Sequence, residues 1–192
     1  DDFIISDNKE DFPKRISDFL SLSKSELLTK YSLRENKSWK IDIVKNKAQP
    51  FDMITIKKIS YRPFDRRYIY YDNNFIERSR SDVMPNLFYK NIGLVFRRQQ
   101  PESLDLFVFC ADNCMADGYI RSDNKGSESI APLYHYPETK QSEIGKNGER
   151  EPNLNMEIVQ KIADGLVLQF TKEKEDTEGT FAPIDLLDYI YA

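Results

Sequence analysis

The residues that could hold a metal or form a redox pair are few in this sequence. Cys110, Cys114 and His135 are its only cysteines and histidine, and these three ligands fall short of the four that a closed zinc site needs. Three residues separate the two cysteines, which is longer than the CxxC spacing of a redox pair. We therefore expect free thiols in a reducing compartment, a structural His135, and no metal site.

Acidic residues are numerous, but no pair of them is set out as a catalytic site. The 32 acids are scattered along the chain, which is typical of a solvated surface. The nearest approach to a nuclease site is Asp112 together with Asp123, Asn124 and Lys125, and the last three lie beside Gly126 in a polar segment. We expect no catalytic residue. A hydrolase that uses Asp112 and Asp123 is an alternative, which metal-dependent cleavage that is lost in Asp123→Asn would establish.

The usual signatures of nucleotide and methyl-donor binding are also missing. The seven glycines form neither a phosphate-binding loop nor a GxGxxG turn. The sequence also lacks the Asn-Pro-Pro tetrapeptide, flanked by an aromatic residue, of amino-methyltransferases. We expect no cofactor in this chain.

Basic and aromatic residues gather in the middle of an acidic chain. The formal net charge is -4, yet residues 56–98 contain ten basic residues and only four acids. Seven of the ten are arginines, whose planar guanidinium group matches phosphate oxygens and the guanine edge. Nine aromatic residues lie among them. This distribution indicates binding to a polyanion, although charge alone leaves open a structural network of ion pairs or a protein-binding face.

The helices and strands that must position these residues can be predicted from the sequence, and together they indicate an α+β fold. Residues 11–47 have the spacing and capping signals of short helices, so a short helical N-terminal arm is expected. Short β-branched and aromatic runs between turn residues predict a central mixed or antiparallel β-sheet region. Its expected strands are residues 53–61, 67–71, 92–96, 104–110 and 130–134.

Two C-terminal helices are also expected. Apolar residues repeat at helical spacing from Leu154 to Leu166, with Asn153 or Asn155 as the N-cap. A second helix begins at Pro183 and runs to the last residues of the sequence. Its apolar side chains need something to pack against, so we expect the chain to be a fragment of a larger protein.

Length and hydropathy place the chain among soluble proteins with about one domain. We expect residues 1–50 to form the helical arm and residues 51–192 to form one compact α+β unit. No apolar run approaches the roughly 18 to 20 residues of a membrane span, and no leader is visible. We expect a cytoplasmic protein without a membrane partner.

Four motifs, taken in order, resemble a known protein family. They are Tyr61 to Tyr71 (YRPFDRRYIYY), Gly93 to Gln99 (GLVFRRQ), Ala131 to Pro137 (APLYHYP) and Pro183 to Ala192 (PIDLLDYIYA). Together they resemble the C-terminal part of large single-chain restriction-modification enzymes, the type ISP and type IIG proteins with an adenine-specific DNA methyltransferase. The order of motifs matches from about Ser17 to the last residue.

The resemblance implies a bacterial target recognition domain, the part of such enzymes that reads the DNA sequence. Upstream domains of the family carry the methyl transfer and cleavage. The resemblance therefore implies double-stranded DNA as a partner, together with the methyltransferase and other domains of the same polypeptide. S-adenosylmethionine is expected only in the methyltransferase domain of the parent enzyme.

Residue roles follow from charge and from the resemblance together. Arginine and lysine residues of the basic segment are expected to hold phosphates, while a smaller set reads base edges. The residues expected to bind DNA are Arg66, Arg67, Asn73, Asn74, Arg78, Arg80, Arg97, Arg98, Gln99 and Gln100. Residues 122–129 and 138–153 are loops that are candidates for specificity.

The first motif also contains residues that we assign to structure, namely Arg62, Pro63, Phe64, Asp65 and Tyr68. Pro63 fixes a turn, Phe64 is expected to point inward, and Asp65 orients an arginine, for instance Arg62.

A docking module is the alternative from another functional class. In that interpretation an apolar arm from Asp11 to Trp39 binds neighbouring domains of the same polypeptide, and the chain has little DNA affinity of its own. Substituting both Arg97 and Arg98 with alanine discriminates between the two, because only DNA binding depends on these side chains.

Overall fold

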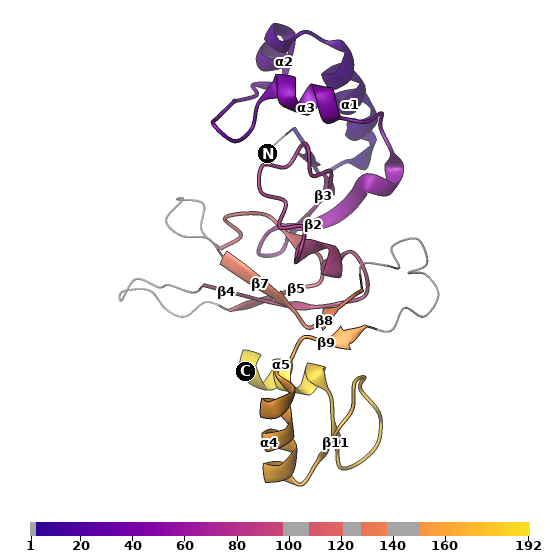
Figure 1. The fold of residues 1–192 in the computed structure, drawn as a ribbon, viewed down its shortest axis with the longest axis vertical. Helices are drawn as coiled ribbons and strands as arrows, with labels where there is room; N and C mark the ends of the chain where they lie inside the picture. Colours follow the sequence, from indigo (N-terminus) through magenta and orange to yellow (C-terminus); the bar gives the residue numbers. More distant parts are fainter. Residues whose placement is uncertain (1–2, 98–107, 121–127, 138–149) are drawn as a thin grey trace.

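In a computed structural model, the chain is described over residues 3–97, 108–120, 128–137 and 150–192. It is elongated, with three tiers along its longest axis (Figure 1). N-terminal helices form one end, small β-sheets form the middle, and two helices with short strands form the other end. Among the described helices, none has the length and apolar character that a membrane span requires.

The N-terminal tier contains the short helices that the sequence predicts. They are α1 (Phe12–Ser21), α2 (Lys24–Tyr31) and α3 (Ile41–Lys47), and the short helix η1 (Lys9–Asp11), which was not predicted, precedes them. Helix α2 begins at a capping box in which the Ser23 hydroxyl accepts from the Glu26 amide and the Glu26 carboxylate accepts from the Ser23 amide. Helix α1 buries Phe12, Ile16 and Phe19 completely, because their spacing places them on one face.

This tier shares its core with the middle of the molecule. Strand β1 (Ile5–Ser6) pairs antiparallel with β3 (Asp65–Tyr70), and the rings of Phe19 and Phe75 lie 4.9 Å apart between centroids. The buried residues of the N-terminal helices and most of those of the middle sheets belong to one continuous cluster. The parts before and after residue 50 therefore have a common core. The division into two domains at this residue stays a prediction.

Two small sheets form most of the middle tier. The first has the order β1-β3-β2-β6, in which β2 (Ile56–Arg62) runs antiparallel to β3 and parallel to β6 (Cys114–Met115). The second is antiparallel with the order β5-β4-β7, built from β4 (Gly93–Arg97), β5 (Phe109–Ala111) and β7 (Glu128–Pro132). The remaining elements are η2 (Met53–Thr55), η3 (Met84–Leu87) and the antiparallel pair β8 (Tyr134–His135) and β9 (Glu151–Pro152).

The C-terminal tier contains both predicted helices. Its elements are α4 (Met156–Leu166), β10 (Gln169–Phe170), β11 (Thr180–Phe181) and α5 (Pro183–Tyr191). Asn155 caps α4, because its side-chain oxygen accepts from the amides of Glu157 and Ile158. Asn153 instead donates to the Pro132 carbonyl oxygen, over 2.8 Å.

The expected α+β class, with helices at both ends and a mixed or antiparallel sheet region between them, is confirmed. The strand expected over residues 104–110 falls mostly outside the described residues, and β5 includes its last two positions. The sequence did not predict β1 or β6, which are two residues long each.

Candidate nucleic-acid interface

Most cations of the basic segment lie in two places, the β2–β3 hairpin and the loop that follows it, while Lys90 precedes β4 and Arg97 ends that strand. Three of the arginines face carboxylates. Arg66 lies 3.2 Å from Asp112, and Arg67 contacts Asp65 at 2.8 Å. The guanidinium group of Arg80 lies 3.9 Å from a carboxylate oxygen of Asp117. Part of the positive charge is therefore neutralised within the fold, as the structural alternative requires.

Next to the turn of the hairpin, two guanidinium groups lie over one ring. The guanidinium groups of Arg62 and Arg67 lie 4.3 Å and 4.0 Å from the centroid of Tyr61. Arg67 donates to both carboxylate oxygens of Asp65, and these bonds hold the pKa of Asp65 below its ordinary value of 3.8. The expectation that Asp65 orients an arginine holds, but that arginine is Arg67, whereas Arg62 donates to the Tyr61 carbonyl oxygen.

The prediction that Phe64 points inward is wrong. Arg62 and Asp65 are paired residues of the hairpin, so Pro63 and Phe64 form its two-residue turn. Phe64 has a φ of 67° and its side chain is 98% exposed. A positive φ at the second central position, after proline at the first, is typical of a type II turn. Tyr68 lies farther down β3, half-buried, opposite Lys58.

Residues 71–83 form a loop that is fastened at several points. Its first turn is closed by Asp72, whose side chain accepts from the Asn74 amide and whose carbonyl oxygen accepts from the Phe75 and Ile76 amides. Phe75 is buried in the core, and its carbonyl oxygen accepts from the indole N–H of Trp39, over 3.0 Å. The loop is thus anchored to the N-terminal tier.

The far end of the loop is anchored to the second sheet. Arg80 has a φ of 46° and donates to the carbonyl oxygen of Glu128, on β7, over 3.0 Å. Its own carbonyl oxygen accepts from the amides of Val83 and Met84. The Tyr71 hydroxyl donates across the loop to the Ser79 carbonyl oxygen. Arg78, between these anchors, is therefore presented by a well-supported backbone.

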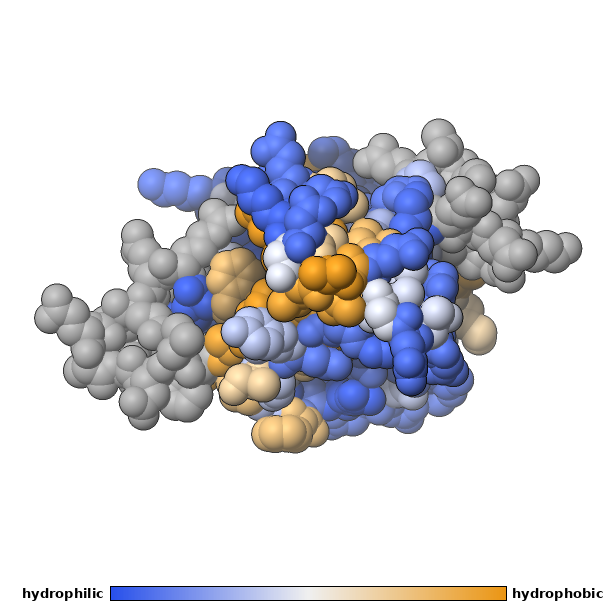
Figure 2. Space-filling view, turned by 90° about the horizontal axis from the view of Figure 1, so that it is seen from below, coloured by the Kyte–Doolittle hydropathy of each residue, from blue (hydrophilic) through white to orange (hydrophobic). Residues whose placement is uncertain are grey.

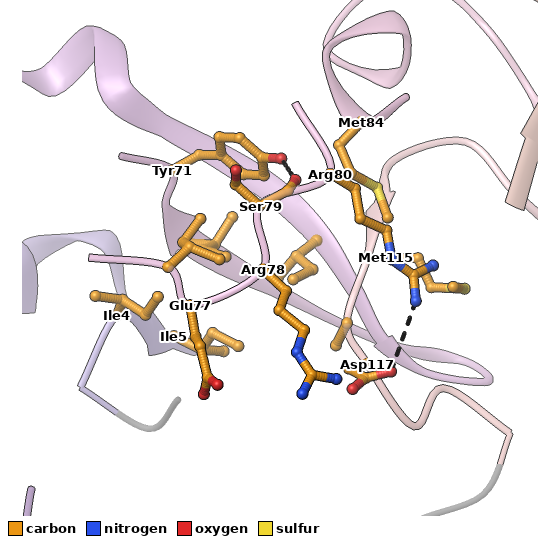
Figure 3. Close-up of a pocket in the computed structure, with 14 residues that line it drawn as sticks. Ile4, Ile5, Tyr71, Glu77, Arg78, Ser79, Arg80, Met84, Met115 and Asp117 are labelled. Atoms are coloured by element: carbon orange, nitrogen blue, oxygen red, sulfur yellow. Dashed lines mark hydrogen bonds and ion pairs between the residues drawn. The ribbon is translucent and has the colours of Figure 1, made fainter. Parts of the chain in front are cut away.

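A groove of about 270 Å³ lies beside this loop (Figure 3). Isoleucine and methionine side chains of several elements line it, among them Ile59 on β2, Ile69 on β3 and Met115 on β6. Its charged residues are Glu77, Arg78, Arg80 and Asp117. Figure 3 shows Arg78 extended beside Asp117, with Arg80 joined to Asp117 by the dashed ion pair.

Arg78 differs from the other arginines of the hairpin and loop. It is exposed, and no hydrogen bond or ion pair ties it to any part of the chain that the structure describes. Its neighbour Glu77 is held through one carboxylate oxygen, which accepts from the Asn36 side chain over 2.9 Å. The groove therefore offers a free guanidinium donor beside a positioned carboxylate acceptor, which is a set suited to base edges.

The structure gathers some of the predicted DNA-binding residues and separates others. Asn73, Asn74, Arg78 and Arg80 share the loop, whereas Arg66 and Arg67 lie on β3 and half-buried Arg97 ends β4. Arg98, Gln99 and Gln100 lie outside the described residues, as do residues 122–127 and 138–149 of the two candidate specificity loops.

Sequence reasoning missed two acidic residues of the groove. Glu77 lies next to Arg78, so its position in the predicted basic segment could have drawn attention to it. Asp117 follows β6, and only tertiary structure places it at the loop. No local signal in the sequence indicates that contact.

The residues considered for metal or hydrolytic chemistry are dispersed. Cys110 and Cys114 are free thiols on β5 and β6. Burial raises the pKa of Cys114 to about 12, and His135 is exposed on β8. Asp112 faces Arg66, while Asp123 lies outside the described residues. The described part of the chain holds no group of three or more His, Cys, Asp or Glu side chains that could bind a metal ion.

Comparisons with known proteins show one matching family and several similar solved structures, among them two complexes with DNA. The sequence matches the family model of the Type ISP C-terminal specificity domain over residues 1–192. The cryoEM structure of a DrdV–DNA complex shares the fold with a TM-score of 0.61 and 16% identity, over 100% of this chain and 17% of that chain. The ATP-dependent Type ISP restriction-modification enzyme LlaBIII bound to DNA gives a TM-score of 0.59 and 16% identity, over 84% of this chain and 11% of that chain.

Among curated proteins, no relative matches the sequence at a significant level. The chain spans less than a fifth of the length of either similar structure.

Proposed function

The chain belongs to the family of Type ISP C-terminal specificity domains, and we propose on that basis that it reads the sequence of double-stranded DNA for a restriction-modification enzyme. The family match supports a recognition role. The two similar structures, which are complexes with DNA, support DNA as the partner.

The observation that carries this proposal within the molecule is Arg78 in its groove. A guanidinium group that is anchored by its backbone, unpaired in the described structure and adjacent to a fixed carboxylate has donors and acceptors for base edges. Arginine reads the O6 and N7 atoms of guanine, and a carboxylate accepts from the N4 amine of cytosine. Arg78 and Glu77 together therefore favour a G·C pair.

Phosphate contacts supply most of the affinity in this account. Lys58 and Lys90 are exposed, and Lys57 is half-buried with its ammonium group 5.2 Å from the Phe88 ring centroid. Arg66 keeps 67% of its side chain exposed beside Asp112. Such cations hold the DNA backbone without regard to sequence and set the register in which the loop meets the bases.

The rest of the proposal concerns the larger enzyme of which this chain would be a part. We propose that the chain positions DNA for adenine methylation, and for cleavage where the enzyme cleaves, by domains upstream in a type ISP or type IIG polypeptide. S-adenosylmethionine would bind in the methyltransferase domain and supply the methyl group there. The target adenine would leave the stack to reach that domain, since a stacked base is out of reach of the chemistry. Residues 98–100, which are expected to read adenine through Gln99 and Gln100, remain candidates for contacts at that site.

Selection from a random duplex library tests the proposal. The chain is incubated with duplexes that contain a randomised central region, and the bound fraction is amplified and sequenced over several rounds. We expect one motif of defined sequence to be enriched, with a G·C pair whose enrichment disappears in Arg78→Ala. Recovery of duplexes without any common motif would contradict sequence-specific recognition.

Docking to neighbouring domains is the second candidate, and one observation favours it. The arm from Asp11 to Trp39 offers little apolar surface, because most of its apolar side chains pack fully or partly into the chain's own core, although Leu28 is exposed. Figure 2 looks onto the opposite end of the molecule and shows apolar side chains gathered among polar ones. The exposed apolar residues of this tier are Met156, Ile158, Leu166, Val167, Tyr189, Ile190 and Tyr191.

The two candidates occupy different surfaces, so one chain could serve both. The apolar C-terminal tier would bind another domain of the polypeptide, while the hairpin and loop of the middle tier meet DNA. Alanine at Leu166 and Val167 is expected to leave duplex binding unchanged. A loss of duplex binding in this variant with an intact fold would show that DNA contacts the C-terminal tier instead.

A further inference from the structure

The tip of the β2–β3 hairpin presents a bare aromatic ring. Phe64 is 98% exposed and has a φ of 67°, a conformation that residues other than glycine rarely adopt. A single exposed apolar residue needs no explanation by itself. Here exposure coincides with an unusual backbone conformation, and such coincidences are concentrated at functional sites.

The support beneath this ring is rigid. Pro63 restricts φ at the first turn position, and the pairing of Arg62 with Asp65 closes the hairpin. Asp65 is held by hydrogen bonds from Nε and Nη2 of Arg67, whose guanidinium group also lies 4.0 Å from the Tyr61 ring centroid. A ring on such a support loses little conformational entropy when it meets a partner.

Charged residues flank the ring on both sides of the turn. Arg62 and Arg66 flank the turn, and the Arg66 side chain is 67% exposed. Both line, with Phe64, a hollow of about 570 Å³ whose walls also include the rings of Phe109, Tyr119 and Tyr191 and the carboxylates of Asp112 and Asp188. The core of a protein interface is usually depleted in charge, so a lone ring between guanidinium groups is poorly suited to an apolar protein surface.

These features fit stacked bases with phosphates on either side. Proteins that unstack DNA insert an apolar wedge such as phenylalanine at a base step, while basic residues hold the neighbouring backbone. A ring that projects from a narrow hairpin has the shape for such a step. The aromatic hollow beside it has room for a displaced base, which stacks on rings of this kind.

We infer that Phe64 is a wedge that enters a base step of the bound duplex, with Arg62 and Arg66 on the adjacent phosphates. The inference rests on the proposed function, because it requires duplex DNA at the hairpin. It adds a residue that recognises DNA through the deformability of a step, which is independent of the base-edge contacts of the Arg78 groove.

Fluorescence of 2-aminopurine tests the wedge. Duplexes that carry the enriched motif, each with one 2-aminopurine at a different position, are titrated with wild type, Phe64→Ala, Phe64→Tyr and Tyr189→Ala. Tyr189 is a matched control, since this aromatic residue of α5 is 84% exposed. Circular dichroism and thermal unfolding check that each variant is folded, which is expected for changes at exposed positions.

We expect wild type, Phe64→Tyr and Tyr189→Ala to raise the fluorescence at one step, where the base loses its stacking partner. Phe64→Ala is expected to abolish that rise and to bind the duplex roughly five- to a hundredfold more weakly. A rise of equal size with Phe64→Ala would overturn the inference, and so would duplex binding by wild type without any rise. In both cases the proposed function stands, whereas wild type that binds no duplex overturns both.

Discussion

At the scale of single residues, recognition depends on which arginines the fold leaves free. Arg67 and Arg80 are tied to Asp65 and to the Glu128 carbonyl oxygen, respectively. These contacts orient the hairpin and the loop, so substitution of either arginine would confound a loss of binding with a loss of structure. Arg78, which has no partner in the described residues, is the better probe.

Arg78→Ala is expected to cost about 1 to 3 kcal/mol in binding of the selected motif and to relax the preference at one base pair. The matched control is Arg34→Ala, which removes the same charge from an exposed position of the N-terminal tier. Fluorescence anisotropy with the motif and with a scrambled duplex separates the two effects. If Arg78→Ala lost the same affinity for both duplexes, Arg78 would contact a phosphate and not a base.

The Asp65–Arg67 pair gives a prediction about pH. Hydrogen bonds from Arg67 lower the pKa of Asp65 from 3.8, so the carboxylate stabilises the folded state above that pH, and the contribution is lost as the pH falls through the folded pKa. Asp65→Asn is therefore expected to be slightly less stable than wild type at pH 7, by urea unfolding. The difference should shrink at pH 3 and below; a constant difference would indicate that the charge is irrelevant.

The types of residue in the hairpin predicted its turn and one of its contacts, but they did not predict which way the Phe64 side chain points. Pro63 in the turn and a carboxylate that orients an arginine follow from local chemistry. The outward Phe64 does not, because hydrophobic patterning assigns a ring between two strands to the core and ignores the positive φ that this two-residue turn imposes. The contact of Arg80 with β7 crosses 48 residues and lies beyond any local pattern.

At the scale of elements, β4 is the central strand of the second sheet and is sensitive to added volume. A Cβ atom at Gly93 would lie 2.6 Å from Cγ1 of Ile130, a buried and β-branched side chain of the paired strand. Gly93→Ala is expected to destabilise the fold by about 1 to 3 kcal/mol.

Gly165→Ala is the control, because nothing lies within 4 Å of the added Cβ atom and the residue belongs to α4. Alanine should stabilise this helix by up to about 1 kcal/mol. Chemical denaturation of both variants measures whether each substitution lowers or raises the free energy of unfolding. If the Gly93 variant matched wild type, the packing of Ile130 on β4 would be looser than described.

The helices and the longer strands were predictable because periodicity and caps act within a few residues. Asn155 illustrates this, since the capping oxygen lies beside the amides that it accepts from. Strands β1 and β6 have two residues each, too few for any alternation to be visible. They exist because β3 and β2 offer edges to pair with, which is a property of the assembled sheet.

At the scale of the whole molecule, the distribution of charge fits a protein that meets DNA with its middle tier. Acidic residues around the hairpin and groove neutralise part of the local charge, so the surface is less cationic than the composition of residues 56–98 suggests. Affinity should then be modest and depend on a limited number of phosphate contacts, with selectivity added by the groove and the hairpin tip.

A duplex titration at two salt concentrations tests the central claim that this chain binds double-stranded DNA through that tier. The logarithm of the association constant should fall with the logarithm of salt with a slope of about -0.9 per phosphate contact, and Arg78→Ala should weaken binding of the selected motif at both concentrations. Absence of duplex binding at the lower salt concentration by the folded chain, or binding that is unaffected by salt and by Arg78→Ala, would contradict the account.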